Sequence, residues 1–263
     1  MAGEFDLSGK VAIVTGASRG LGQYMSRALA RAGADVVITS RTLESLDQTR
    51  ADIEAVGRKA LPCVLDVRKL DTIHPMVDRA LAQFGKIDIL VNNAGCNIRK
   101  ASVDVTPEDW SFVVDTILKG SFFVAQAVAR SAMLPHKKGR IISVGSGTSL
   151  FGFPGIVPYC ASRGGITQMT KALAAEWAPH GITVNVLAPG WFRTAQNDIL
   201  FQDPEWVARV VEKVPAGRTG SPTDLDGTIV FLASDASAYV TGQLLFVDGG
   251  FTIGAMPAMP AKR

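Results

Sequence analysis

The chain has 263 residues, 47% of them hydrophobic, which is enough for a buried core and too apolar for an intrinsically disordered protein. Its 27 Lys and Arg residues nearly balance its 24 Asp and Glu residues, and the net charge of +3 is spread along the chain. A nucleic-acid-binding protein would gather its basic residues for phosphate contacts, so this class is not expected.

The cysteines and histidines do not indicate a disulfide framework or a metal site. Cys63, Cys96 and Cys160 are far apart, odd in number and without a CxxC motif, as expected for reduced thiols. The three histidines lack metal-ligand spacing. The N-terminus has no signal-peptide pattern, and no uncharged apolar run approaches the ~20 residues of a membrane helix. We therefore expect a cytoplasmic protein that binds neither metal nor membrane.

Short apolar runs rich in β-branched residues alternate with longer segments of helical period along the whole chain. The predicted strands are 11–15, 35–40, 60–65, 87–91, 140–144, 182–187 and 244–247. The predicted helices are 21–32, 42–56, 70–84, 107–133, 159–177, 204–214 and 223–234. Continuous apolar strands alternating with helices are typical of a parallel sheet covered on both faces. We predict one α/β Rossmann domain over residues 1–263, with a doubly wound parallel sheet of about seven strands.

A glycine-rich segment follows the first predicted strand and opens the first predicted helix. It reads Thr15-Gly16-Ala17-Ser18-Arg19-Gly20-Leu21-Gly22. Glycines allow a tight turn and a close approach of the backbone to a diphosphate, whose charge then lies at a helix N-terminus. A glycine-rich turn alone is weak evidence, but its position between a buried strand and a helix favours a dinucleotide site. The predicted cofactor contacts here are Gly16, Ser18, Arg19, Gly20, Leu21 and Gly22.

The end of the second predicted strand indicates which dinucleotide binds. An NAD site usually has an acidic residue there, which binds the ribose 2′-hydroxyl. This chain has Ser40 and Arg41 at that point, and its first acidic residue is Glu44. A guanidinium can bind a 2′-phosphate through paired hydrogen bonds, whereas a carboxylate would repel it. Arg41 and Arg19 therefore favour NADP(H) over NAD(H), unless both are ordinary solvated arginines.

The spacing Thr-Gly-x-x-x-Gly-x-Gly of residues 15–22 resembles the short-chain dehydrogenase/reductase family, as do motifs farther along the chain. Asp66-Val67 follows the third predicted strand, Asn92-Asn93-Ala94-Gly95 the fourth, and Pro189-Gly190 with Thr194 the sixth. The resemblance runs from about Leu7 to Gly250. It implies that the cofactor also contacts Asp66, Val67, Asn93, Ala94, Gly95, Pro189, Gly190 and Thr194.

The same resemblance identifies a candidate catalytic pair. Ser146 follows the fifth predicted strand, and Tyr159 comes thirteen residues later at the start of a helix. In the family, the tyrosine hydroxyl passes a proton while hydride moves between nicotinamide and substrate carbon, and the serine hydrogen-bonds the substrate oxygen. Each residue alone could be an ordinary loop serine or a half-buried aromatic, but the spacing behind the other motifs favours the catalytic roles.

Two positions depart from the family pattern, and both belong to its proton relay. The lysine expected four residues after the tyrosine, on the same helix face, is Arg163. Arginine supplies positive charge and can bind ribose hydroxyls, but it does not give up a proton. An asparagine that helps to hold a water in relatives is replaced by Ile117. Three explanations of the two departures remain open. They are independent drift, a coupled replacement in which Ile117 packs against the stem of Arg163, and deliberate alteration. We predict that Tyr159 and Arg163 contact the cofactor and take part in catalysis, with slow turnover or another proton route.

The segment 191–218 is expected to cover the site and to set its specificity. Together with Asn97-Ile98-Arg99, it is most similar to gluconate 5-dehydrogenases and related sugar-acid oxidoreductases, and almost as similar to 3-oxoacyl-carrier-protein reductases. Arg99, Arg193, Gln196 and Asn197 offer cations and amides suited to a hydroxylated, anionic substrate, unless they face solvent. The predicted substrate contacts are Arg99, Ser146, Arg193 and Gln196.

Two functions from different classes are consistent with these residues. The first is an NADP(H)-dependent oxidoreductase that interconverts a secondary alcohol and a ketone on a small, polar, sugar-acid-like molecule, and Ser146 with Tyr159 favours it. The alternative is an NADP(H)-binding protein with little or no redox activity, a sensor or partner subunit, and Ile117 with Arg163 favours it. The family is usually dimeric or tetrameric, so we expect a homodimer or homotetramer.

Overall fold

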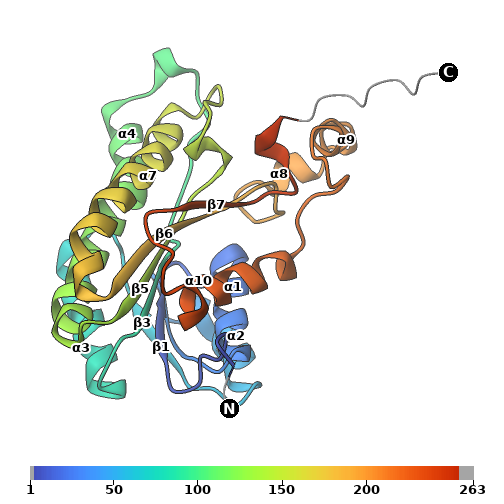
Figure 1. Ribbon diagram of the computed structural model, residues 1–263. Coiled ribbons are helices and arrows are strands. Elements are labelled where there is room, and N and C mark those ends of the chain that lie inside the picture. Colours follow the sequence, from blue (N-terminus) through green and yellow to red (C-terminus); the bar gives the residue numbers. More distant parts are fainter. Residues whose placement is uncertain (1–2, 255–263) are drawn as a thin grey trace.

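Residues 3–254, which the computed structural model describes, form one parallel sheet with helices on both faces (Figure 1). Seven strands lie in the order β3-β2-β1-β4-β5-β6-β7, and every pairing is parallel. Their bounds are β1 Val11–Val14, β2 Asp35–Ser40, β3 Ala60–Val64, β4 Ile89–Asn92, β5 Gly139–Val144, β6 Ile182–Pro189 and β7 Leu244–Val247. The predicted α/β fold with a doubly wound sheet is therefore confirmed.

The strands are mostly apolar because their side chains alternate between two cores. The helices α1 Gly20–Arg31, α2 Asp47–Glu54 and α10 Asp226–Ala233 cover one face, and α3 Ile73–Phe84, α5 Gly120–Val128 and α7 Val157–Trp177 cover the other. In β1, Val11 and Ile13 belong to the core under α3, α5 and α7, whereas Ala12 and Val14 belong to the core under α1, α2 and α10. Successive strand residues point to opposite faces, so a strand covered on both sides has few polar positions.

The strand order predicts a ligand-binding crevice at the carboxyl ends of the strands. From β1 the chain first adds β2 and β3 on one side, and it then adds β4 to β7 on the other side. In open parallel sheets, ligands bind where the order reverses, beyond the carboxyl ends of the strands. The segment after β6 carries two short helices, α8 Asp198–Phe201 and α9 Pro204–Glu212 (Figure 1). The sequence pattern predicted α9 but not α8.

The predicted helix over 107–133 extends to His136 and contains two wider turns. It consists of α4 Pro107–Val114, α5, and α6 Leu134–His136, joined by π-helical segments at Asp115–Lys119 and Ala129–Met133. The second π-helical segment comes just before Pro135, whose missing N–H cannot close a regular helical hydrogen bond. The first contains Ile117, and such turns occur frequently at functional sites. Apolar periodicity does not reveal them because the apolar pattern continues through both.

By length and apolar composition alone, the helix Pro107–His136 could cross a membrane. Half of its most apolar stretch is nevertheless buried inside the fold. There Val124, Ala125 and Val128 pack in the core that α3 and α7 also cover. Packing in this core accounts for the apolar composition of the helix.

Gly181, between α7 and β6, is a position where the fold depends on glycine. Its φ of +71° lies in a region that side chains rarely adopt, and a Cβ would also collide with the carbonyl oxygen of Lys137. We expect Gly181→Ala to lower the free energy of unfolding by more than about 1 kcal/mol, as measured by urea unfolding, because strain and collision add. Gly57→Ala is the matched control, since its φ is +75° but nothing lies within 4 Å. An equal loss in the two variants would contradict the prediction.

Candidate active site

A cavity of about 650 Å³ lies at the carboxyl ends of the central strands. Its wall includes Ser40 at the end of β2, Asn93 after β4, Val144 at the end of β5 and Pro189 at the end of β6. Every residue predicted above for cofactor, catalysis or substrate lines this cavity, with the exception of Arg193. The fold thus brings together motifs that are far apart in the sequence.

Arg193 does not line the cavity. Its side chain is 60% exposed, and its Nε donates a hydrogen bond to Asp198 Oδ1 at 2.7 Å. Asp198 begins α8, the helix that the sequence pattern did not predict. The guanidinium is held on the surface by this ion pair, so the structure offers no support for a substrate contact by Arg193.

The glycine-rich turn after β1 is tied to the end of β4. Asn93 Nδ2 donates hydrogen bonds to the carbonyl oxygens of Thr15 (2.9 Å) and Gly16 (3.0 Å). In return, Thr15 Oγ1 accepts hydrogen bonds from the backbone N–H groups of Asn93 and Ala94, both at 3.0 Å. A Cβ on Gly22 would lie 2.5 Å from Asn93 Nδ2 and would collide with the Gly16 carbonyl oxygen. The turn therefore has room for glycine only, and it keeps the start of α1 open toward the cavity.

The charges that line the cavity are mostly positive. Among the described residues its charged lining consists of Arg19, Arg41, Arg68, Arg99 and Arg163 with Asp66. Arg19 and Arg41 are exposed, and neither forms an ion pair or a side-chain hydrogen bond within residues 3–254. Burial raises the pKa of Asp66, but hydrogen bonds from Arg68 outweigh it and hold this pKa below its usual value. The arrangement suits a ligand that carries several negative charges.

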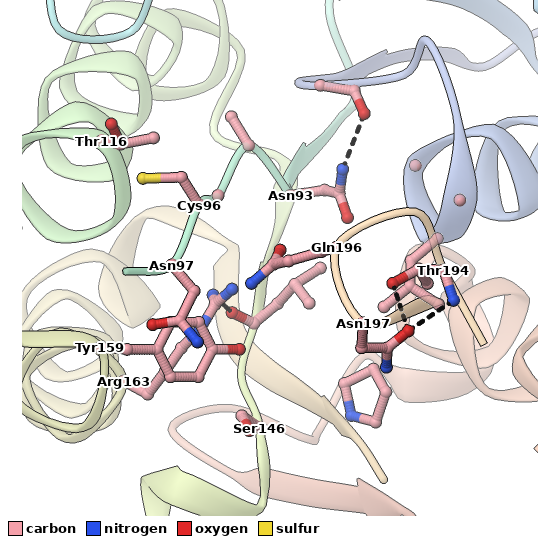
Figure 2. Close-up of a pocket in the computed structure, with 18 of the residues that line it drawn as sticks. Asn93, Cys96, Asn97, Thr116, Ser146, Tyr159, Arg163, Thr194, Gln196 and Asn197 are labelled. Carbon is pink, nitrogen blue, oxygen red and sulfur yellow. Dashed lines mark hydrogen bonds between the residues drawn. The ribbon is translucent and has the colours of Figure 1, made fainter. Parts of the chain in front are cut away.

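Ser146 and Tyr159 open into the same cavity. Ser146 begins a short 3₁₀ turn, where its Oγ accepts a hydrogen bond from the Thr148 backbone N–H at 3.2 Å. Tyr159 lies in the first turn of α7 and is partly buried. Figure 2 shows the Tyr159 hydroxyl pointing into the cavity, with Ser146 on the same side of the ring. A hydroxyl that accepts one hydrogen bond can still donate its own proton, so Ser146 remains available to a ligand oxygen.

Arg163 is buried behind the ring of Tyr159. Only 6% of the residue is exposed, its Cζ lies 4.9 Å from the centre of the Tyr159 ring, and its Nη1 donates to the carbonyl oxygen of Val144. Its Nε is buried without a hydrogen-bond partner among the described residues. A guanidinium over an aromatic face is attracted by the ring electrons. Arg163 therefore holds a permanent positive charge against the tyrosine.

Ile117 is fully buried in a small core. It packs with Val113, Ile166 and Val186, and Tyr159 borders the same cluster. A Cβ on Gly95 would lie 2.9 Å from Arg163 Nη2 and 3.8 Å from Ile117 Cγ1. The two residues that depart from the family pattern thus lie near the same glycine.

Several residues of the cavity wall were not predicted from the sequence. Arg68 lies two residues after Asp66 and binds it with Nη2 and Oδ2 3.1 Å apart. It also stacks on Phe112, with its Cζ 5.0 Å from the ring centre. Its position just after the end of β3 was the available signal. The aromatic residues Phe151, Phe153 and Phe251 were also missed, whereas Trp191 belongs to the segment 191–218 that was expected to cover the site.

The chain matches known dehydrogenases and reductases over nearly its whole length. A profile of the family described as Enoyl-(Acyl carrier protein) reductase matches residues 16–252. Gluconate 5-dehydrogenase of Gluconobacter oxydans (strain 621H) is 43% identical over 249 residues, which is 95% of this chain and 97% of that protein. The 3-oxoacyl-[acyl-carrier-protein] reductase of Thermotoga maritima is 38% identical over 94% of this chain and 99% of its own.

Solved structures agree with these sequence matches. The crystal structure of a gluconate 5-dehydrogenase from Burkholderia cenocepacia J2315, in complex with NADP and tartrate, has a TM-score of 0.92. It is 40% identical in sequence and covers 96% of this chain and 98% of its own. The fold and the motifs around the cavity define an oxidoreductase with a Rossmann-type sheet. The chain belongs to the short-chain dehydrogenase/reductase family, which confirms the resemblance inferred from its motifs.

The lack of space for a side chain at Gly22 leads to a prediction about cofactor affinity. We expect Gly22→Ala to weaken NADPH binding about tenfold or more, because the added Cβ would displace the turn that approaches the diphosphate. Titration calorimetry measures the dissociation constant. Gly227→Ala is the control, since Gly227 lies in α10 and a Cβ there would have no neighbouring atom within 4 Å. Unchanged NADPH affinity in a folded Gly22→Ala variant would show that the turn does not contact the diphosphate.

Proposed function

We propose that this protein is an NADP(H)-dependent oxidoreductase that interconverts a secondary alcohol and a ketone on an anionic, sugar-acid-like substrate, with slow turnover. The observation that carries the proposal is that Ser146 and Tyr159 share one cavity with the glycine-rich turn. The similarity to gluconate 5-dehydrogenases supports the substrate class. Trp191, Gln196 and Asn197 also line the cavity, which supports a role of the segment 191–218 in substrate binding.

The residues of the cavity fit a dinucleotide. Glycines leave the turn open, two exposed arginines lie beside the ends of β1 and β2, and the Arg163 charge lies deeper in the cavity wall. When bound, the nicotinamide supplies hydride to the carbonyl carbon, or accepts it in the reverse direction. In ketone reduction, the Tyr159 hydroxyl gives its proton to the carbonyl oxygen while Ser146 donates a hydrogen bond to the same oxygen. One hydride and one proton then convert the ketone into the alcohol.

The proposed preference of the protein for NADP(H) over NAD(H) rests on Arg41. It lies one residue beyond β2 and lines the cavity, and no carboxylate pairs with it within the described chain. We expect Arg41→Ser to raise the dissociation constant for NADPH about tenfold or more and to leave that for NADH within about twofold, because only NADPH carries the 2′-phosphate. Parallel fluorescence titrations measure both constants. Equal weakening for the two cofactors would contradict the assignment.

The environment of Arg163 and Ile117 underlies the proposed slow turnover. Arg163 keeps its proton, and Ile117 presents only carbon, so neither can return a proton to Tyr159. We expect the double variant Ile117→Asn, Arg163→Lys to raise kcat about tenfold or more, because it restores a polar, titratable route. Stopped-flow and steady-state assays of NADPH oxidation measure the change. If the unaltered protein already turns over at about 1–10³ s⁻¹, the relay argument is wrong.

The alternative is an NADP(H)-binding protein with little or no redox activity, and the buried, proton-retaining Arg163 favours it. The two functions separate in one experiment, in which NADPH binding is confirmed by fluorescence. NADPH oxidation is then followed with a panel of ketones that includes 5-ketogluconate. Binding with oxidation supports the enzyme, and tight binding without oxidation across the panel supports the sensor.

A further inference from the structure

The part of the cavity beside Tyr159 has a wall of aromatic rings. Phe151 and Phe153 come from the loop after β5, Trp191 from the segment after β6, and Phe251 from the turn after β7. The ring centres are 5.7 Å apart for Phe151 and Phe251, 6.0 Å for Phe251 and Trp191, and 6.3 Å for Trp191 and Phe153. The four rings form one connected surface, which we call the aromatic wall.

Trp191 is held in place from behind. Trp206 on α9 packs edge-on against it, with ring centres 5.0 Å apart and an angle of 84° between the planes. Phe201, at the end of α8, packs in turn against Trp206 at 5.6 Å. The indole Nε1 of Trp191 is buried and has no hydrogen-bond partner in the part of the chain that the structure describes. Trp191 therefore presents carbon atoms, and not a hydrogen-bond donor, to the cavity.

The cavity that carries the aromatic wall is also lined by polar side chains, among them Ser146, Asn97 and Gln196. The backbone N–H of Lys100 donates to the Gly155 carbonyl oxygen at 2.9 Å, which ties the segment carrying Arg99 to the loop that carries Phe153. Arg99 thus brings one exposed cation to this end of the cavity. The carboxylate among the described lining residues, Asp66, follows β3 at the far edge of the sheet.

We propose that the substrate is an oxo acid, or the corresponding hydroxy acid, that carries an apolar ring or chain beside its reacting carbon. This inference rests on the proposed oxidoreductase function and names the substrate class for the same cavity. Its carboxylate would pair with Arg99, and its apolar part would pack on the aromatic wall. Hydroxyl groups of a polyhydroxylated acid that faced the aromatic wall would meet rings that cannot hydrogen-bond them, which costs free energy. The likeness to sugar acids then extends to the carboxylate and the reacting carbon, and not to the remaining hydroxyls.

The test compares two oxo acids on the NADPH-saturated protein, 5-ketogluconate and 3-oxo-3-phenylpropanoate. We expect kcat/KM to be about tenfold or more higher for the phenyl compound. Phe153→Asn should lower kcat/KM for the phenyl compound about tenfold, change it less than about twofold for 5-ketogluconate, and leave the NADPH dissociation constant unchanged. Phe5→Asn is the matched control, because Phe5 is 54% exposed, packs on Phe231 and does not line the cavity.

Higher kcat/KM for 5-ketogluconate, equal values for the two acids, or an equal loss for both in Phe153→Asn would overturn the inference. If neither acid oxidises NADPH, the proposed oxidoreductase function fails for these compounds, and calorimetry decides the substrate class separately. Tighter binding of the phenyl compound to the NADPH-saturated protein, lost in Phe153→Asn, would support the aromatic wall as its binding surface. Equal or weaker binding of that compound would reject it.

Discussion

The hydrogen bonds between residues 93–94 and the turn after β1 hold together the ends of β1 and β4, where the strand order reverses. Four of them join the residues 15–16 to the residues 93–94, with backbone and side chain taking part on both sides. A typical hydrogen bond contributes about 1 kcal/mol, but a buried carbonyl left without one costs more. Glycine at position 22 is the condition for this contact, because any Cβ would collide with the acceptor of one of these bonds. The opening of this turn toward the cavity depends on this arrangement.

The electrostatics of the cavity follow from an excess of guanidinium groups. The described lining residues include five arginines but only one aspartate, Asp66, which already forms an ion pair with Arg68. Arg19 and Arg41 remain in contact with solvent, so their charges cost little in the free protein. Arg163 is different because it is buried and binds a carbonyl oxygen and a ring instead of a carboxylate. A negative charge arriving near Tyr159 would lower the free energy of this buried cation.

Much of the fold could be predicted because the strands, covered on both faces, are mostly apolar and are separated by helices of clear period. The motifs at the strand ends could be predicted because parallel strands place their carboxyl ends along one edge. The substrate contact expected of Arg193 finds no support because α8 is only one turn long, and its first residue, Asp198, supplies the partner that removes the guanidinium from the cavity. The aromatic wall joins rings from residue 151 to residue 251. It could not be predicted because local sequence patterns carry no information about contacts between segments so far apart.

The substitution of lysine by arginine retains one property of the family's proton relay and removes another. Both side chains carry positive charge at neutral pH, and the charge of Arg163 lies against the ring of Tyr159, where a cation contributes about 0.5–2 kcal/mol. A lysine can also release and take up a proton, and a guanidinium cannot. Ile117 and Arg163 both lie near Gly95, so this side of the site carries a carbon side chain and a guanidinium. In the proposed reaction Tyr159 gives one proton that neither Arg163 nor Ile117 can replace, so the proposed slow turnover is assigned to proton return and not to hydride transfer.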